Sequence, residues 1–361
     1  MGAEDLRPKL ACVVKYFPPM PRISGILRFV SDLADELGAF FRLRVITYRY
    51  NALAKPREKR NGYDVIRRGR PFPFLAGREI RSWRPETVIF GSGFWRPELL
   101  WGYWELFRMG LGANRPELIL TQYTNMTPRL RFFLKKLFPP PDKIIATTTE
   151  IGKYWEPFYP GRVTVIPPGL RTAMSKEPAA RQPGKVKIGY FGHLEPHKGP
   201  DLALKIFQEL NPPAAELVIA GEGEMAEELS QKARGWTNIR VIGYLAEVDR
   251  EIRSCDLVLL PFRSAVSVLG YSRVALEALA AGIPVLTTPN PSVAPLISEG
   301  ENGFICSGEE ELKQKLRLFL SDDDLRRHLA RGAQNRGKAF DIKQTARDHL
   351  HLIWPDKGTP A

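Results

Sequence analysis

The sequence predicts an α/β protein with the GT-B arrangement of two Rossmann-like, doubly wound domains, for three reasons. The chain has 361 residues, and at about 150 residues per domain this length gives two domains. Apolar runs of strand length alternate with segments of helical period in both halves, as βαβ units with parallel sheets require. A segment rich in Pro and Gly at 160–184 separates the two series, as an interdomain connection would.

In the first half, the segment 26–38 has the period of an amphipathic helix and ends at Gly38. Buried strands are expected at 10–17, 42–48, 86–92, 117–123 and 143–149. In the second half, strands are expected at 186–192, 216–221, 239–245, 256–262 and 283–288. Helices are expected there at 200–210, 274–282, 312–320, 324–340 and 341–354. The predicted parts are an N-terminal domain, 1–170, a C-terminal domain, 171–340, and a C-terminal crossover helix and tail, 341–361.

The composition excludes several classes of protein. Hydrophobic residues make up 43% of the chain and charged residues 26%, so both halves can bury a core and wholesale disorder is excluded. No apolar run reaches the roughly 18 residues that span a bilayer, and the N-terminus is charged, which predicts a cytoplasmic, non-spanning protein. Cys12, Cys255 and Cys306 lie far apart in apolar segments, so we expect reduced core thiols and neither disulfides nor a metal site.

The positive charge lies in the first half. The chain has a net charge of +13, and residues 1–180 hold 30 Lys and Arg against 16 Asp and Glu. Such an excess favours an anionic partner: nucleic acid, an anionic lipid surface or a phosphate-bearing substrate. The alternative is an Arg-rich surface without a partner. No nucleic-acid-binding motif supports the first partner, so we expect no nucleic acid.

Two loops that join a strand to a helix have the residues of an anion site. The first, FPPMPRISGILRF at 17–29, contains Ser24 and Gly25, which either bring backbone N–H groups to an oxyanion or only shape the turn. The second, FGHLEPHKG at 191–199, combines Gly192 with His193 and Lys198, a cation that a departing diphosphate requires. The alternative for Lys198 is a solvated lysine in a turn.

Two further segments are ambiguous. AGEGEMA at 220–226 has the form G-x-G-x-x-A, but its two glutamates would repel a pyrophosphate, so Gly221 is better explained as a turn residue than as part of a dinucleotide site. Glu277 lies in VALEALAAG, on a helix apolar enough to be buried. Its carboxylate needs partners there, either the hydroxyls of a ribose or an arginine.

The motifs FPP…SG, G-H-L-x-P-x-K-G, A-G-E-G and A-L-E-A-L-A-A-G-I-P-V, followed by E-G-E-N-G-F, resemble in this order the retaining glycosyltransferases of family 4. The likeness is strongest over 186–340. It implies two Rossmann-like domains facing across a cleft, with a final helix that crosses back to the N-terminal domain. It also implies a UDP- or GDP-linked sugar held by the C-terminal domain as a substrate, with no cofactor and no required metal.

The resemblance also implies roles for single residues. Lys198 matches the lysine that binds the donor diphosphate, and Glu277 the second glutamate of an E-x7-E signature, which holds the ribose. Gly192 and Gly221 end the strands that face the donor, and Ser24 and Gly25 belong to the N-terminal loop near its phosphates. The loop that meets the base corresponds to Gly243, Tyr244 and Leu245, and the amides that approach the donor to Gly270, Tyr271 and Ser272.

The chain departs from the family pattern at three places. Leu269 replaces the first glutamate of E-x7-E, which leaves the donor sugar undefined, and His193 replaces an arginine beside the diphosphate. No histidine precedes His193, so an N-terminal histidine mechanism is excluded, and Gln122 and Tyr123 occupy the corresponding region. The expected reaction is a same-face attack in which the departing diphosphate takes the proton of the acceptor.

The expected acceptor is a glycan or an anionic lipid-linked sugar at the inner face of the membrane, as in cell-envelope glycan biosynthesis. Aromatic and basic residues gather at 93–112, which includes Trp95, and 129–138 is a short basic amphipathic segment. Both segments suit sugar stacking or a lipid surface, or else they are helices that face the core. Two other functions stay open: a catalytically degenerate GT-B binding or scaffold protein, and a sugar-nucleotide epimerase with the same fold.

Overall fold

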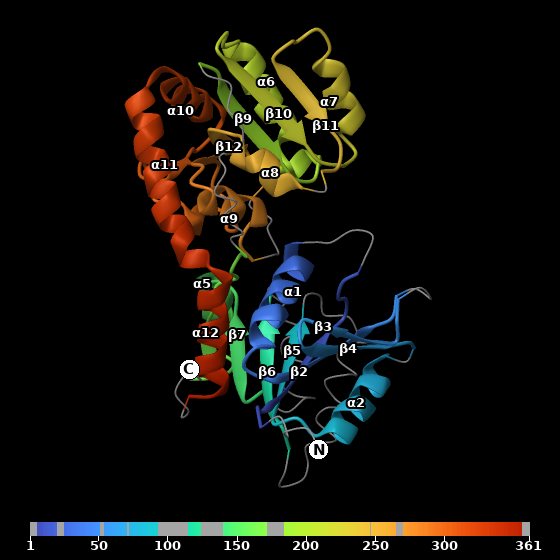
Figure 1. Ribbon diagram of the computed structural model, residues 1–361. Coiled ribbons are helices and arrows are strands. Elements are labelled where there is room, and N and C mark those ends of the chain that lie inside the picture. The colour runs from blue at the N-terminus through green and yellow to red at the C-terminus, as the bar shows by residue number, and fades with distance from the viewer. Residues whose placement is uncertain are drawn as a thin grey trace. The chain divides into compact units, whose positions relative to one another are not determined.

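The computed structural model describes nine stretches of the chain, which form two compact units. Unit 1 comprises Met1–Arg171, Val268–Gly270 and Ile342–Ala361, and unit 2 comprises Thr172–Ser267 and Tyr271–Asp341. The described residues are 6–19, 25–50, 54–70, 72–92, 115–123, 140–171, 184–245, 247–264 and 270–355. Each unit is an α/β domain built around a mostly or wholly parallel sheet, and this confirms the predicted fold class (Figure 1).

Unit 1 is built on an eight-stranded sheet with the order β3-β4-β2-β1-β5-β6-β7-β8. All neighbouring strands are parallel except β3 and β4. The strands are β1 (Lys9–Val14), β2 (Arg42–Tyr48), β3 (Arg57–Arg60), β4 (Tyr63–Arg68), β5 (Thr87–Ser92), β6 (Glu117–Gln122), β7 (Lys143–Ala146) and β8 (Val163–Val165). The central strands carry apolar residues on both faces, as a sheet covered on both sides requires.

Helices cover both faces of this sheet (Figure 1). On one face, α1 (Gly25–Leu37) and α12 (Ile342–Ile353) contact each other and share a core with β1, β2 and β6. On the other face, α2 (Phe72–Trp83) and α5 (Thr149–Trp155) pack on the opposite side chains of the same strands.

The hairpin of β3 and β4 and the helices α2 and α5 are absent from the sequence-based prediction. Asn61 and Gly62 both have positive φ, 43° and 86°, as the central residues of a type I′ hairpin turn do. The flanking strands contain many charged residues, so their alternation of polar and apolar residues is weak. An Asn-Gly pair between them was the signal available in the sequence.

Unit 2 is built on a wholly parallel six-stranded sheet with the order β11-β10-β9-β12-β13-β14. Its strands are β9 (Val186–Phe191), β10 (Ala215–Ala220), β11 (Ile239–Ile242), β12 (Leu257–Leu260), β13 (Val285–Thr287) and β14 (Gly303–Ile305). The chain adds strands to one side of β9 and then returns to add the rest on the other side. The order therefore reverses between β9 and β12, which is the point where ligands bind in open α/β sheets.

The helices of unit 2 are α6 (Pro200–Leu210), α7 (Ala226–Lys232), α8 (Val248–Arg253), α9 (Arg273–Ala280), α10 (Glu309–Ser321) and α11 (Asp323–Gly337), with short 3₁₀ turns η1 (Pro196–Lys198), η2 (Ala294–Leu296) and η3 (Lys338–Phe340). Helices α6 to α9 lie between successive strands of unit 2, and α10 and α11 follow its last strand. Helices α6, α7 and α10 share one apolar core with the sheet, while α9 contacts α8, α11 and β13. Cys12, Cys255 and Cys306 are free and buried, as expected.

The C-terminal helix returns to unit 1, as the predicted GT-B fold requires. The amide of Ile342 donates to the carbonyl of Leu170 at 2.9 Å, and the Thr345 hydroxyl donates to the Pro167 carbonyl at 3.1 Å. Lys143 of β7 caps the other end through the Leu352 carbonyl at 2.6 Å. Among the described residues, no helix combines the length and apolar character needed to cross a membrane.

Candidate functional site

The candidate site lies at the carboxyl edge of the unit 2 sheet, where the loops after β9, β10, β11 and β12 begin (Figure 1). Gly192 and His193 follow β9, Gly221 follows β10 and Gly243 follows β11. Parallel strands all end at the same edge, so residues that are far apart in sequence come to one side of the sheet. The structure thus places most of the predicted donor-binding residues of unit 2 at one edge.

The loop after β9 leads to Lys198 through a defined series of turns. His193 is exposed, and its carbonyl accepts a hydrogen bond from the buried hydroxyl of Tyr190 at 3.1 Å. Lys198 is the last residue of the 3₁₀ turn η1. Gly199 follows it with a φ of 71° and is the N-cap residue of α6. A Cβ on Gly199 would lie 2.0 Å from the Pro261 carbonyl, so only glycine lets this turn approach the loop after β12 so closely.

Lys198 is a partly dehydrated cation. Its Nζ lies 5.3 Å from the centre of the Phe262 ring, and the side chain is half-buried. Burial lowers the pKa of Lys198 below its usual value, with a partial opposing effect of the Glu195 carboxylate. A phosphate group beside Lys198 would replace the lost hydration with a charge-assisted contact.

The loops after β9 and β10 pack directly on each other. The amide of Leu194 donates to the Glu222 carbonyl at 2.9 Å, and that of Met225 donates to the Leu194 carbonyl at 3.0 Å. A Cβ on Gly221 would lie 1.8 Å from the Gly192 carbonyl oxygen. Gly221 therefore shapes the edge, as the sequence indicated, and its amide already donates to Ile242 at 3.1 Å.

The predicted base-binding loop is open. Gly243 and Tyr244 are exposed after β11, and Tyr244 shows 56% of its surface, unusual for a large aromatic residue. Leu245 is half-buried beside them. An exposed ring at the edge of the sheet is available for stacking on a planar group.

Glu277 makes the arginine contact that the sequence left open. Arg273 Nε donates to Glu277 Oε1 at 2.7 Å, one helical turn earlier on α9, and only 9% of the Glu277 side chain is exposed. The neighbours Ala275, Leu276 and Ala278 are buried, so this pair forms the polar stripe of an otherwise apolar helix. Sequence reasoning did not identify Arg273, whose spacing of four residues from Glu277 was the available signal.

The stretch before α9 does not present all the amides that the resemblance implied. The Gly270 amide donates to the Tyr123 carbonyl at 3.0 Å within unit 1, and the Ser272 amide donates to the Ser292 carbonyl at 2.8 Å within unit 2. Both N–H groups are therefore engaged in the protein itself. Ser272 caps α9 through its hydroxyl, while Tyr271 packs edge-on against Phe340 with ring centres 6.2 Å apart.

The predicted acceptor residues that the structure describes are buried. Gln122 ends β6 with 0% exposure, and Tyr123 lies in the core with its ring 6.3 Å from that of Phe29. Burial also raises the pKa of Tyr123. Both side chains are therefore covered by the protein itself, and their role towards the acceptor stays a prediction. Gly25 begins α1, and Ser24, Trp95, Leu269 and the segments 93–112 and 129–138 lie outside the described residues.

Sequence reasoning also missed a depression next to Lys198 at the same edge. It has a volume of about 450 Å³ and lies where α6, α10 and the loops after β12, β13 and β14 meet. Its lining residues are Leu202, Phe262, Arg263, Ser264, Thr288, Pro289, Ser307, Gly308 and Glu309. Arg263 is fixed there by an ion pair with Asp201.

Comparison with known proteins agrees with this architecture. Residues 173–336 match the family model of glycosyl transferases group 1. A D-inositol 3-phosphate glycosyltransferase of Stackebrandtia nassauensis is 28% identical over 241 residues, which cover 58% of this chain and 53% of the relative. The chain spans a little over half the length of the curated relatives it matches.

Solved structures show the same fold at low sequence identity. A glycosyltransferase of Rickettsia africae has a TM-score of 0.78 at 14% identity, covering 98% of this chain and all of that one. HepE of Anabaena, solved in complex with UDP, has a TM-score of 0.75 at 16% identity, covering 96% and 99%. Unit 2 thus carries the sequence pattern of glycosyl transferases group 1, and the chain has the GT-B fold.

Proposed function

We propose that this protein is a retaining glycosyltransferase that moves a sugar from a UDP- or GDP-linked donor to a glycan or lipid-linked acceptor. The observation that carries the proposal is the carboxyl edge of unit 2, which holds Lys198, the exposed His193 and an open aromatic loop within the segment that matches glycosyl transferases group 1. The UDP complex of HepE, which shares the fold, supports a nucleotide-linked donor.

Each group of this edge has a role in the proposed reaction. Lys198 neutralises the diphosphate, and His193 of the same loop offers it a further hydrogen bond. The Glu277 carboxylate accepts hydrogen bonds from the ribose hydroxyls, and the ion pair with Arg273 holds it in place. Tyr244 and its neighbours Gly243 and Leu245 meet the base. Gly192 leaves open space for the phosphates after β9, and Gly221 lets the loop after β10 pack closely against the Gly192 carbonyl.

The reaction balances without an enzymatic nucleophile. The acceptor hydroxyl attacks the anomeric carbon from the face that the diphosphate leaves, so the new glycosidic C–O bond forms as the C–O bond to the diphosphate breaks. The hydroxyl proton passes to a departing diphosphate oxygen, and the products are the glycoside and the nucleoside diphosphate. The proposal needs no metal and no cofactor, because Lys198 supplies the positive charge for the leaving group.

The acceptor is proposed to meet unit 1, whose positive charge favours a phosphate-bearing molecule. The relative from Stackebrandtia nassauensis supports this class, since its name specifies an inositol phosphate. Trp95 and the segment around it remain the proposed sugar contact. We place the reaction in the cytoplasm, at the inner face of the membrane.

The donor site is tested by thermal unfolding with UDP-, GDP- and ADP-sugars and the bare nucleotides. Because a ligand that binds only the native state stabilises it, one nucleotide should raise Tm. Lys198→Ala should weaken that nucleotide by about 10- to 100-fold, the value of a hydrogen bond to a charged group. Glu277→Gln should weaken it as well, while Lys232→Ala, on the exposed lysine of α7 paired with Glu228, should not.

The anomeric configuration of the product, followed by NMR with the nucleotide-sugar that binds, tests the retaining step. An inverted product would contradict the same-face mechanism. Binding of a nucleotide without transfer to any glycan or lipid-linked acceptor would favour the degenerate binding protein instead. No change in Tm with any nucleotide would remove the donor site from unit 2.

A further inference from the structure

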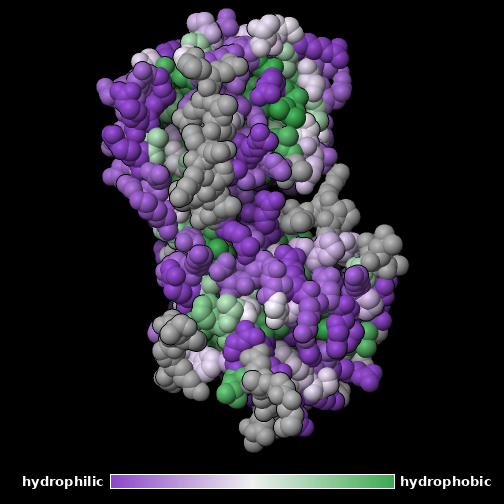
Figure 2. All heavy atoms as spheres, viewed as in Figure 1, coloured by the Kyte–Doolittle hydropathy of each residue, from purple (hydrophilic) through white to green (hydrophobic). Residues whose placement is uncertain are grey.

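One face of unit 1 carries an unusual concentration of positive charge. Residues 55–84 hold ten Lys and Arg against three Asp and Glu, an excess that accounts for about half of the net charge of the chain. They form the hairpin of β3 and β4 at the edge of the sheet, and the helix α2 beside it. Figure 2 shows hydrophilic side chains over β3 and β4. We call this region, residues 55–84, the basic face.

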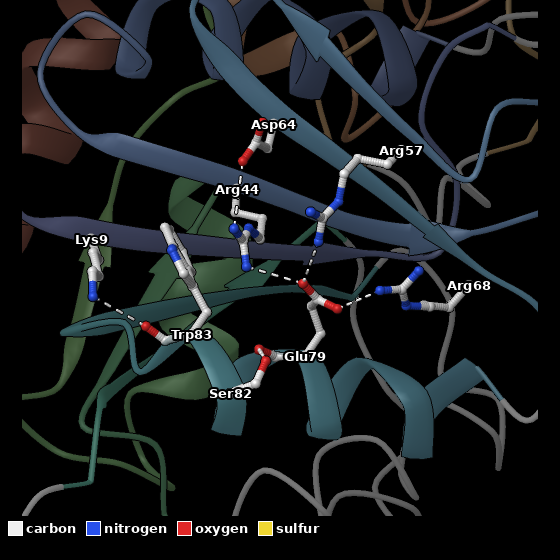
Figure 3. Close-up of polar contacts among 8 residues, drawn as sticks. All are labelled: Lys9, Arg44, Arg57, Asp64, Arg68, Glu79, Ser82 and Trp83. Atoms are coloured by element: carbon white, nitrogen blue, oxygen red, sulfur yellow. Dashed lines mark hydrogen bonds and ion pairs between the residues drawn. The ribbon is translucent and has the colours of Figure 1, made fainter. Parts of the chain in front are cut away.

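Beneath the basic face, arginines of the face and Arg44 of β2 cluster around one carboxylate (Figure 3). Glu79 of α2 accepts hydrogen bonds from Arg44 at 3.0 Å, from Arg57 at 3.4 Å and from Arg68 at 2.5 Å, three residues on three different strands. Asp64 adds a second contact to Arg44. Three guanidinium groups thus share two carboxylates, and the cluster keeps one uncompensated positive charge.

Burial makes the uncompensated positive charge of this cluster energetically unfavourable. Arg44 is 12% exposed, its guanidinium lies 4.3 Å from the centre of the Trp83 ring, and burial lowers its pKa. Arg57, by contrast, is 61% exposed at the outer side of the cluster. An anion outside Arg57 would offset the repulsion among the three guanidinium groups. The cluster also holds the hairpin against α2, so the outer charges stand on a rigid support.

The outer layer consists of exposed cations that lack acidic partners. Among the described residues, none of the following side chains has a carboxylate within ion-pair distance: Lys55, Lys59, Arg70, Arg78, Arg81 and Arg84. Unit 2 shows the contrast, since Lys313 alone contacts three glutamates and Lys232 contacts Glu228. Exposed cations that are clustered and unpaired repel one another and favour a polyanionic partner.

The shape of the basic face decides between polyanions. Its charges spread over a hairpin and the outward side of α2, where Arg78 and Arg81 lie one turn apart. Described aromatic residues there are buried or covered: Tyr63 and Phe72 lie in the core and Trp83 lies under Arg44. A single-stranded nucleic acid would use exposed rings for stacking, whereas an anionic bilayer needs only a broad set of cations.

We propose that the basic face is a docking surface for anionic phospholipid. The partner is the headgroup layer itself, held by charge, because the exposed side chains that the structure describes on α2 are Arg78, Arg81 and Ser82, all of them polar. The inference deepens the proposed function and rests on it for one point. A lipid-linked acceptor lies in a membrane, so an enzyme that uses it must bind there. It places that contact on β3, β4 and α2, which the sequence analysis did not single out.

Co-sedimentation with vesicles tests the docking surface. The full chain should pellet with vesicles of phosphatidylglycerol and phosphatidylcholine, stay in solution with phosphatidylcholine alone, and be released by salt that shortens the Debye length. The triple variant Lys59→Gln, Arg78→Gln, Arg81→Gln should bind about 100-fold more weakly, since each cation near an anionic surface contributes roughly fivefold. A short RNA should compete poorly with the vesicles.

The matched control removes the same charge from unit 2. Arg234, Arg317 and Arg331 are exposed cations on separate elements, and their triple replacement by Gln should leave vesicle binding unchanged. Equal losses in the two triple variants, no loss in the first, or tighter binding of RNA would overturn the proposal. The nucleotide-induced rise in Tm, measured on the same proteins, separates the two proposals: it should persist in both variants, and its absence would contradict only the donor site.

Discussion

At the residue scale, three glycines set how closely the loops of unit 2 can approach. Gly199, Gly221 and Gly223 each face a carbonyl oxygen that a Cβ would meet at 2.3 Å or less. Gly221 and Gly199 also have positive φ, 155° and 71°. The sequence showed a glycine-rich pattern here, and the structure shows that its cause is contact between backbones.

Substitution of these glycines should damage the edge of the sheet. Gly221→Ala and Gly223→Ala should each lower the free energy of unfolding by about 1–3 kcal/mol, because the added methyl would force the loops after β9 and β10 apart. Urea unfolding measures the loss. The control is Gly308→Ala, which has open space around its Cα and an extended φ of −177°. An equal loss in the control would contradict the explanation by close approach.

The position of Arg273 is explained by its contact with Glu277. A cation in the first turn of a helix opposes the helix dipole, and an Arg four residues before a Glu is the less favourable order for an isolated helix. The ion pair with Glu277 is therefore poorly explained by the stability of α9. The ion pair is better explained by the Glu277 carboxylate, which needs a positive partner because its side chain is largely removed from water.

At the element scale, α12 depends on a buried histidine that must stay neutral. His349 is 1% exposed, and its Nδ1–H donates to the Thr345 carbonyl at 2.8 Å. Its Nε2 is buried and has no hydrogen-bond partner among the described residues. Burial lowers the pKa of His349 to about 4, against smaller opposing effects of the Thr345 carbonyl and Asp348.

The helix should therefore lose stability in mild acid. As pH falls from about 6.5 to about 4, the unfolded chain takes up a proton at this histidine before the native state does, so the free energy of unfolding decreases. The slope from this one group approaches about 1.4 kcal/mol per pH unit. Urea unfolding across this range should show a weaker pH dependence in His349→Gln.

The exposed His351 on the same helix provides the control. His351→Gln should keep the pH dependence of the wild type, because the His351 side chain is exposed and folding does not remove it from water. The same change of slope in both variants would assign the effect to the net charge of the helix and contradict the role of burial.

At the scale of the whole molecule, unit 1 is built mainly from two segments that are far apart in the sequence, Met1–Arg171 and Ile342–Ala361. Helix α12 packs on α1, and its residues Ile342, Ala346, Leu350 and Ile353 belong to the core of unit 1. Gly169 fits against the start of this helix, since a Cβ there would lie 2.6 Å from the Ile342 Cα. The core of unit 1 is therefore incomplete without α12.

Truncation should confirm this dependence. A chain that ends at Asp341 should show faster amide hydrogen exchange in α1 and in the strands that face α12, because their apolar side chains lose their cover. Exchange in α6 and α10 of unit 2 should be unchanged. A chain that ends at Pro355 keeps α12 and should behave like the full chain, and faster exchange in unit 2 of the shorter chain would contradict the division.

The sequence by itself determined the alternation of strands and helices, the fold class, the buried thiols and the segment of unit 2 that holds the candidate site. These features follow from the local spacing of apolar residues and from the common direction of parallel strands, and both can be read from one sequence. Gly192, His193 and Lys198 could be placed at the edge of the sheet because they follow a strand.

Only the tertiary structure decided the rest. It gave Glu277 its arginine, engaged the amides of Gly270 and Ser272, and buried Gln122 and Tyr123. It also gathered Arg44, Arg57 and Arg68 on Glu79. These outcomes depend on contacts between segments distant in sequence, and the free energy of burying a polar group is set by the partner it meets and not by its local pattern.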